Sequence, residues 1–156
     1  MPDPIPGQHD HLPVAPTVGG LHHVELWVPD FGRATASWEW LLAALGYTRY
    51  QEFPNGVSWR HPGTGVYIVL EQSPDMLAIP HDRHRPGLNH LAFLAGDRAA
   101  VERLAVEALA HGWTVRERIV PAAGEAGYEA THLTDRDGFE VELVVASPDS
   151  RQGGEG

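Results

Sequence analysis

Apolar and polar residues alternate in two segments of the chain that resemble each other. The first is Leu21–Asp30, with the sequence LHHVELWVPD, and the second is Leu88–Asp97, with the sequence LNHLAFLAGD. Leu, His and Asp recur at three positions with a constant offset of 67 residues, and apolar residues match between them. Such alternation predicts a β-strand in each segment, ending at a turn that contains Pro or Gly before the Asp.

A helical pattern and three more strand-like runs follow each of these segments. The helices are predicted at about residues 33–45 and 98–111, and each ends at a glycine, Gly46 or Gly112, as a left-handed C-terminal cap favours. The further strands are predicted at 47–52, 57–60 and 66–71 in the first copy, and at 113–119, 128–134 and 139–145 in the second. Each copy therefore has the order β-α-β-β-β, and the fold class is α+β.

The repeat divides the chain into two modules with less regular segments around them. The ends are rich in Pro, Gly and Asp and show no periodicity, so we interpret them as flexible tails. The predicted units are a tail at 1–19, a first module at 20–72, a linker at 73–87, a second module at 88–146 and a tail at 147–156.

Composition narrows the function classes. The chain of 156 residues has a formal net charge of −10 and no basic stripe, which argues against binding to nucleic acid. Without cysteine or lysine it can form neither thiolate metal sites nor a Schiff base, whereas its 10 histidines include possible metal ligands. We see no apolar run long enough for a membrane span and no signal peptide, so the cytoplasm is the expected location.

The strand pattern selects particular residues from this pool. Alternate side chains of a strand share a face, so His23 and His90 occupy equivalent faces of the two modules, turned away from the helices. His22 is not selected, because Asn89 stands at its place in the second copy. Glu71 and Glu142 lie on the last strands, and aligning them keeps the same parity. Two imidazoles with one or two carboxylates suit Zn, Ni, Mn or Fe(II).

Three segments resemble the signature sequences of the vicinal oxygen chelate superfamily. They are Leu21–Asp30, Asn89–Phe93 and Asp135–Leu143, the last of which contains the specific ending DxDGFxVEL. That superfamily includes glyoxalase I, extradiol dioxygenases, methylmalonyl-CoA epimerase and the fosfomycin- and bleomycin-resistance proteins. The resemblance covers roughly residues 20 to 146 and implies two half-barrels, a curved mixed sheet around a metal-binding cavity.

The resemblance also implies roles for individual residues. His23, His90 and Glu142 match the three usual metal ligands, and Glu71 lies near a fourth position that glyoxalase-like members fill with a carboxylate. An error of one or two residues in the register would place Val69 or Tyr67 there instead. With Glu71 as ligand, Glu142 and Glu71 are the expected catalytic carboxylates of a glyoxalase-like lyase or isomerase, which we favour. Without it, an Fe(II) ring-cleaving dioxygenase gains support.

Other residues are candidates for the walls of the cavity. The linker run His81–Arg85 is interpreted as a solvated loop, with a lid over an anionic group as the alternative. A non-catalytic drug-binding protein, similar to the acidic bleomycin-resistance proteins, stays open as a further reading. A homodimer that acts on a small molecule or drug is expected by analogy. The candidates for the substrate pocket are Glu25, Trp27, Trp59, Tyr67, Tyr128 and His132.

Overall fold

The computed structural model describes residues 18–77, 79–121 and 128–146. The predicted tails fall largely outside this part of the chain. The first module consists of β1 (His23–Trp27), α1 (Phe31–Ala44), β2 (Thr48–Phe53), β3 (Gly56–Arg60) and β4 (Tyr67–Glu71). The second consists of β5 (Leu91–Leu94), α2 (Arg98–Ala108), a 3-10 turn (Leu109–His111), β6 (Thr114–Pro121), β7 (Glu129–Thr134) and β8 (Glu140–Val144).

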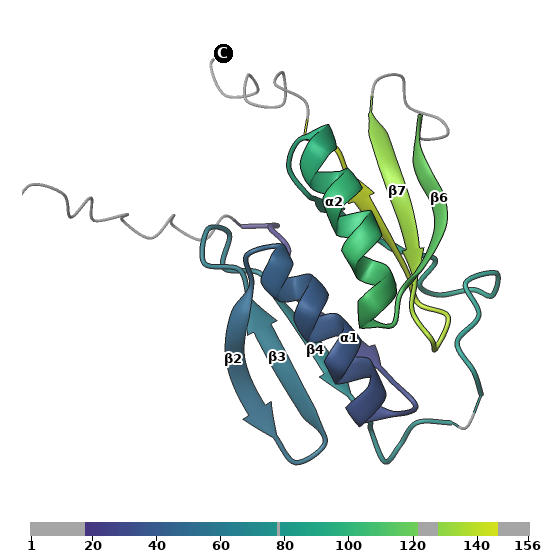
Figure 1. The fold of residues 1–156 in the computed structure, drawn as a ribbon. Coiled ribbons are helices and arrows are strands. Elements are labelled where there is room, and N and C mark those ends of the chain that lie inside the picture. Colours follow the sequence, from purple (N-terminus) through teal and green to yellow (C-terminus); the bar gives the residue numbers. More distant parts are fainter. Residues whose placement is uncertain (1–17, 78, 122–127, 147–156) are drawn as a thin grey trace, which may run out of the picture.

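Each module forms its own four-stranded mixed sheet (Figure 1). The strand orders are β1-β4-β3-β2 and β5-β8-β7-β6, so the two sheets have the same topology. In both, the first strand runs parallel to the last, and the remaining neighbours are antiparallel. The parallel pair follows from the helix that crosses back between the strands. The predicted tandem βαβββ architecture is confirmed.

The repeated Asp and Gly residues set the limits of the helices. The side chain of Asp30 accepts a hydrogen bond from the backbone N–H of Arg33 at 2.9 Å, and Asp97 does the same for Ala100 at 2.8 Å. These N-caps satisfy backbone donors that have no partner within the helix. After the helices, Gly46 and Gly112 have φ angles of 86° and 85°, the left-handed geometry predicted from the sequence.

One hydrophobic core joins the two modules. The rings of Trp38, from α1, and Trp113, after the 3-10 turn, meet edge to face with centroids 5.2 Å apart. The indole N–H of Trp38 donates to buried Asp135 at 3.0 Å, and that of Trp113 donates to the carbonyl of Ser37 at 3.1 Å. Buried polar groups are stable only when they are paired, so these bonds fix how the modules dock.

The linker between β4 and β5 packs against the second module. The ring of His81 stacks on Phe139 with centroids 4.2 Å apart, and Arg83 forms an ion pair with buried Glu140 at 3.2 Å. The interpretation of this segment as a solvated loop is therefore wrong for these two residues. None of the helices in the described part of the chain is long and apolar enough to cross a membrane.

Candidate functional site

The faces of β1 agree with the alternation in its sequence. His23, Glu25 and Trp27 are exposed on one face, whereas Leu26 is buried and Val24 packs against the core on the other. The same parity holds in β8, where Val141 is part of the core. The predicted site residues therefore lie on the strand faces that point away from the helices, as the alternation in the sequence indicates.

Strand register decides which residue of β4 corresponds to Glu142. In the second module Ala92 pairs with Glu142, and in the first module the equivalent residue, Glu25, pairs with Val69. Glu71 pairs instead with Trp27, one strand repeat farther along. The alignment of Glu71 with Glu142 therefore does not match the register, although both alignments keep the same parity. A valine at this position supplies no fourth metal ligand.

His90 and Glu142 lie close enough to share a metal ion. His90 Nε2 is 3.6 Å from Glu142 Oε2. Two ligand atoms at about 2.1 Å from a metal, seen at angles of about 90° to 120°, are roughly 3.0 to 3.6 Å apart. The pair therefore fits two adjacent coordination positions. His90 lies directly before β5 and Glu142 on the neighbouring strand β8, so the parallel pairing of these strands brings the two side chains together.

Asn89 selects the tautomer of His90 that a metal requires. The Asn89 side-chain N–H donates to the carbonyl of Arg83 at 2.9 Å, which turns its Oδ1 toward His90 Nδ1 at 2.7 Å. An amide carbonyl oxygen can only accept a hydrogen bond, so Nδ1 of His90 is the donor in this contact, and in the neutral ring the lone pair then lies on Nε2. His22 occupies the equivalent place in the first module, with its Nδ1 2.8 Å from Nδ1 of His23.

Sequence reasoning passed over both of these partners. It dismissed His22 because Asn89 differs from it in type, yet each residue contacts the Nδ1 atom of the histidine that follows it. Their shared position could have identified them, because His22 and Asn89 are both polar residues directly before the repeated histidine.

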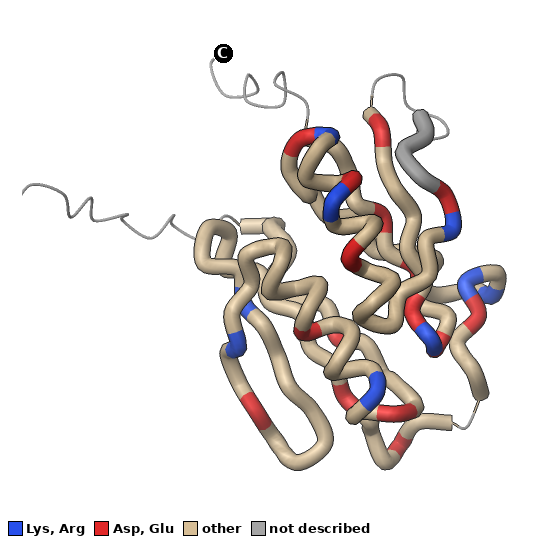
Figure 2. Tube along the Cα trace, in the orientation of Figure 1, with Lys and Arg blue, Asp and Glu red and all other residues tan. Residues whose placement is uncertain are grey.

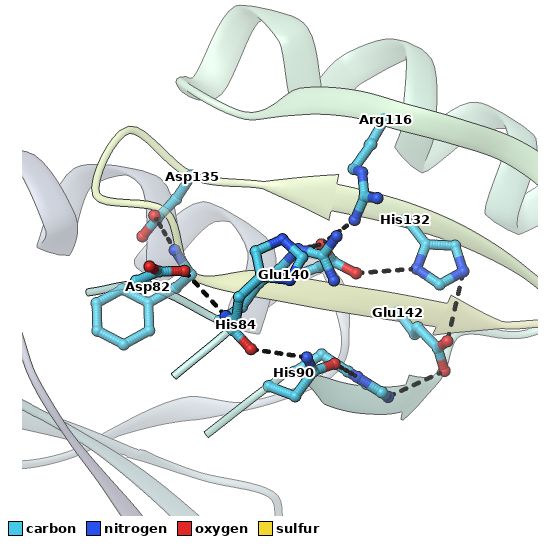
Figure 3. A network of polar contacts seen from close by, with 11 residues as sticks. Asp82, His84, His90, Arg116, His132, Asp135, Glu140 and Glu142 are labelled. Atoms are coloured by element: carbon cyan, nitrogen blue, oxygen red, sulfur yellow. Dashed lines mark hydrogen bonds and ion pairs between the residues drawn. The ribbon is translucent and has the colours of Figure 1, made fainter. Parts of the chain in front are cut away.

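Glu142 belongs to a chain of polar contacts along the second sheet (Figure 3). His132, on β7, places Nε2 3.4 Å from Glu142 Oε1 and Nδ1 3.3 Å from Glu140 Oε1. Oε2 of Glu140 faces Arg116 at 2.7 Å and Arg83 at 3.2 Å. Burial by itself would raise the pKa of Glu140, but hydrogen bonds from Arg116 and His132 and the charge of Arg83 lower it overall.

His23 has different neighbours. Its ring stacks on Tyr67 with centroids 4.8 Å apart and planes 6° apart, and no contact joins it to His90 or Glu142 among the residues that the structure describes. Within that part of a single chain, no three His, Asp or Glu side chains are arranged to hold a metal ion. The predicted ligand set is therefore present as two separate halves, His23 on one sheet and His90 with Glu142 on the other.

Glu71 lies beside a second carboxyl on the first sheet. Burial, followed by a hydrogen bond and the negative charge of Glu25, raises the pKa of Glu71. Glu25 also accepts a hydrogen bond from the indole N–H of Trp27 at 2.8 Å. At roughly 3.3 Å per residue, Glu25 lies about 6.6 Å and Glu71 about 13 Å along the strands from the level of His23.

The remaining residues that were predicted to line the substrate pocket, Glu25, Trp27, Trp59 and Tyr128, lie in different surroundings. Glu25 and Trp27 line a cavity of about 660 Å³ whose wall also includes His81 and Arg136, but which contains none of the predicted metal ligands. This cavity is therefore not the metal site. Trp59 is only 1% exposed and belongs to the core, so its assignment to a pocket wall is wrong. Tyr128 is half-buried directly before β7.

Comparisons with known proteins identify the family. The profile of the glyoxalase/bleomycin resistance protein/dioxygenase superfamily matches residues 22–132. The uncharacterized protein YqjT of Bacillus subtilis (strain 168) is 38% identical over 130 residues, which are 81% of this chain and 99% of that protein.

Solved structures agree with this match. A candidate glyoxalase from Bacillus halodurans has a TM-score of 0.72 and 36% identity, covering 82% of this chain and 96% of its own. The fosfomycin resistance protein FosX from Listeria monocytogenes has a TM-score of 0.58 and 19% identity, covering 85% and 97%, and so shares the fold. The chain belongs to the glyoxalase/bleomycin resistance protein/dioxygenase superfamily, also called the vicinal oxygen chelate superfamily.

Proposed function

We propose that this protein is a divalent-metal-dependent enzyme that binds a small molecule through two adjacent oxygens. Its metal ligands are His23, His90 and Glu142. The observation that carries the proposal is the pair His90 Nε2 and Glu142 Oε2, 3.6 Å apart, with Asn89 holding His90 in the tautomer that leaves Nε2 unprotonated. Two imidazoles and one carboxylate suit Zn, Ni, Mn or Fe(II).

The complete ligand set requires two copies of the chain. In the part of the chain that the structure describes, β1 is an edge strand of the first sheet and β5 is an edge strand of the second. Large apolar side chains are exposed on or next to these edges, including Leu21 at 64%, Trp27 at 44% and Leu94 at 69%. Edges of this kind favour association. A two-fold dimer that sets β1 of one copy against β5 of the other would bring His23 of one copy to His90 and Glu142 of its partner.

The donor set favours oxygen-dependent ring cleavage over the glyoxalase-like reaction. Two histidines and one carboxylate form the ligand set of Fe(II) oxygenases, which leaves coordination positions open for substrate and oxygen. Val69, at the position equivalent to Glu142, offers no fourth ligand. When bound, the ion would act as a Lewis acid on the two substrate oxygens. His132, held between two carboxylates, can exchange a proton with the substrate at Nε2.

A glyoxalase-like lyase or isomerase is the second candidate, and one observation favours it. Glu71 lies beside Glu25 on the face of β1 and β4 that carries His23, where burial and then a hydrogen bond and the negative charge of Glu25 raise the pKa of Glu71. In this reading Glu71 moves a proton on the substrate without binding the metal. The two reactions differ in their need for oxygen, which separates them experimentally.

Metal analysis tests the ligand set. The wild type, His90→Ala, Glu142→Ala and Glu71→Ala should be compared, with His84→Ala as control because His84 is an exposed linker histidine. We expect one metal ion per chain in the wild type, the control and Glu71→Ala, and loss of the metal from the other two variants. If the wild type binds no stoichiometric metal, the proposal is overturned and the hypothesis of a non-catalytic drug-binding protein remains.

Oxygen uptake tests the reaction class. The Fe(II)-loaded wild type should be mixed with a panel of catechols while dissolved oxygen and ring absorbance are followed. Oxygen consumption with loss of the ring absorbance is expected for the dioxygenase. Turnover of 2-oxoaldehyde adducts or of epimerisable acids without oxygen would instead establish the lyase or isomerase reaction.

A further inference from the structure

Two arginines from different parts of the chain converge on one oxygen of Glu140. Nη1 of Arg116, on β6, lies 2.7 Å from Glu140 Oε2, and Nε of Arg83, in the linker, lies 3.2 Å from the same atom. The other oxygen, Oε1, faces His132 at 3.3 Å. Figure 3 shows Glu140 between Arg116 and His132, on the strand that also carries Glu142.

This cluster contains more positive charge than Glu140 requires. The Glu140 side chain is 4% exposed, and one arginine would neutralise it. A guanidinium has five N–H donors, and Glu140 takes one nitrogen from each arginine. The remaining guanidinium nitrogens have no protein partner within the described ranges. The Arg83 and Arg116 side chains are 23% and 43% exposed, so these donors are accessible to a ligand.

Packing holds Arg83 at this position. His81, two residues before Arg83, stacks on Phe139. The backbone carbonyl of Arg83 accepts a hydrogen bond from the side-chain N–H of Asn89 at 2.9 Å. Figure 2 shows the charged positions of this linker segment beside the charged turn between β7 and β8. A purely solvated arginine would not need its backbone to be held by contacts to both Phe139 and Asn89. The chain as a whole has a net charge of −10, so a local positive site matters for any anionic ligand.

The cluster lies one two-residue strand repeat from Glu142, a proposed metal ligand. Glu140 and Glu142 are separated by one residue on the same face of β8, so their Cα atoms are about 6.6 Å apart at roughly 3.3 Å per residue. Glu142 faces the metal position and Glu140 faces the arginines. A compact substrate that chelates the metal with two oxygens can therefore place a second group among the guanidiniums.

We propose that Arg83 and Arg116 form an anion subsite, and that the substrate carries a carboxylate, phosphate or phosphonate group on the Glu140 side of its two chelating oxygens. The inference rests on the proposed function, because it names the class of substrate for that metal site. Guanidinium groups match such oxyanions through paired N–H donors.

The test compares two ligands that differ by one carboxylate group. Catechol and 3,4-dihydroxybenzoate present the same adjacent oxygens, but only the second has a carboxylate at the far end of the ring. Calorimetric titration of Mn²⁺-loaded protein gives the ratio of their dissociation constants. We expect 3,4-dihydroxybenzoate to bind at least tenfold more tightly to the wild type, an amount typical of one charge-assisted contact.

Variants assign that preference to the arginines. The single variants Arg83→Gln and Arg116→Gln each leave one arginine to neutralise Glu140. In each, the ratio of the two dissociation constants should fall toward one, with the bound metal measured beside it. Arg98→Gln is the control, because Arg98 pairs with Glu129 on the outside of the second module. If a glutamine variant does not fold, Arg83→Lys or Arg116→Lys keeps the charge and should retain part of the preference while losing the paired geometry.

The outcomes separate the two proposals. Equal affinities in metal-loaded wild type, or a preference unchanged in the folded variants, would overturn the anion subsite and show that the arginines only neutralise Glu140. The metal site would survive that result. If the wild type binds no metal, the proposed function fails. The metal-free protein is then titrated with inorganic phosphate, and arginine-dependent binding would keep the subsite.

Discussion

The contact between Trp38 and Asp135 determines how firmly the two modules are docked. Trp38 is fully buried on α1, and its indole N–H donates across the module boundary to Asp135, which is 8% exposed. Asp135 also accepts the backbone N–H groups of Asp137 and Phe139 at 2.9 Å, which shapes the turn between β7 and β8. Trp38→Phe removes one bond to a buried carboxylate and leaves the remaining aromatic ring in place.

The expected cost follows from two contributions. A hydrogen bond to a charged group contributes about 1.5 to 3 kcal/mol to stability. The smaller ring leaves roughly 40 Å³ of empty volume, which costs about 1 kcal/mol at about 24 cal/mol per Å³. Together they predict a loss of about 2.5 to 4 kcal/mol in the free energy of unfolding of Trp38→Phe.

Urea unfolding followed by circular dichroism measures this loss. Trp40→Phe is the matched control: Trp40 is half-buried on the same helix, and its ring stacks on His111 with centroids 4.5 Å apart. We expect the control to lose about 1 kcal/mol or less, the size of one aromatic contact. The reasoning is refuted if the two variants are equally stable, because the buried bond to Asp135 would then contribute nothing.

Three further predictions follow from single contacts. Gly112→Ala should lower the free energy of unfolding by about 1 to 3 kcal/mol more than Gly46→Ala does in thermal unfolding. Both glycines have left-handed φ angles, but only at Gly112 would a Cβ lie 2.6 Å from a buried serine oxygen, so equal losses would contradict this prediction. Asn89→Ala should weaken metal binding about 10- to 100-fold in a competition assay, because His90 loses the partner of Nδ1, and an unchanged affinity would exclude that role. Burial raises the pKa of Asp135 above 3.8, so its ionisation costs stability as the pH rises through the raised value. The stability of Asp135→Asn relative to wild type should therefore increase over that range in urea titrations, and a constant difference would refute the assignment.

The sequence repeat carries most of the information about the fold. Alternation predicts β1 and β5, and the paired Asp and Gly residues predict the limits of both helices, because caps and strand periodicity are local properties. Docking of the modules is not local. That Trp38 would find Asp135, almost a hundred residues later, depends on packing that no short pattern encodes.

The sequence predicts which strand faces carry the candidate site residues. It does not predict the pairing register of the strands, which decides which residues lie side by side. Val69 and Glu71 share a face because strands repeat every two residues, so parity cannot distinguish them. Only the pairing of Glu25 with Val69 and of Ala92 with Glu142 shows which residue corresponds to Glu142. Trp59 lies on β3, where the four residues before Arg60 are all buried, so alternation could not assign it to an exposed face.

The role of the linker could not be read from composition. Its charged run is typical of a solvated loop, yet Arg83 reaches Glu140 because His81 packs on the adjacent Phe139. That contact joins a loop to a strand more than fifty residues away and depends on the tertiary structure alone.

Subunit mixing tests the central claim most directly, namely that His23 of one copy completes the site of His90 and Glu142 in another. His23→Ala and Glu142→Ala are purified separately, where each should contain no metal, and are then unfolded, mixed in equal amounts and refolded together. Random pairing puts about half of the chains into mixed dimers with one intact site each, so the account predicts about a quarter of the wild-type metal content. A mixture that remains free of metal, although wild type treated in the same way regains it, would contradict a shared site.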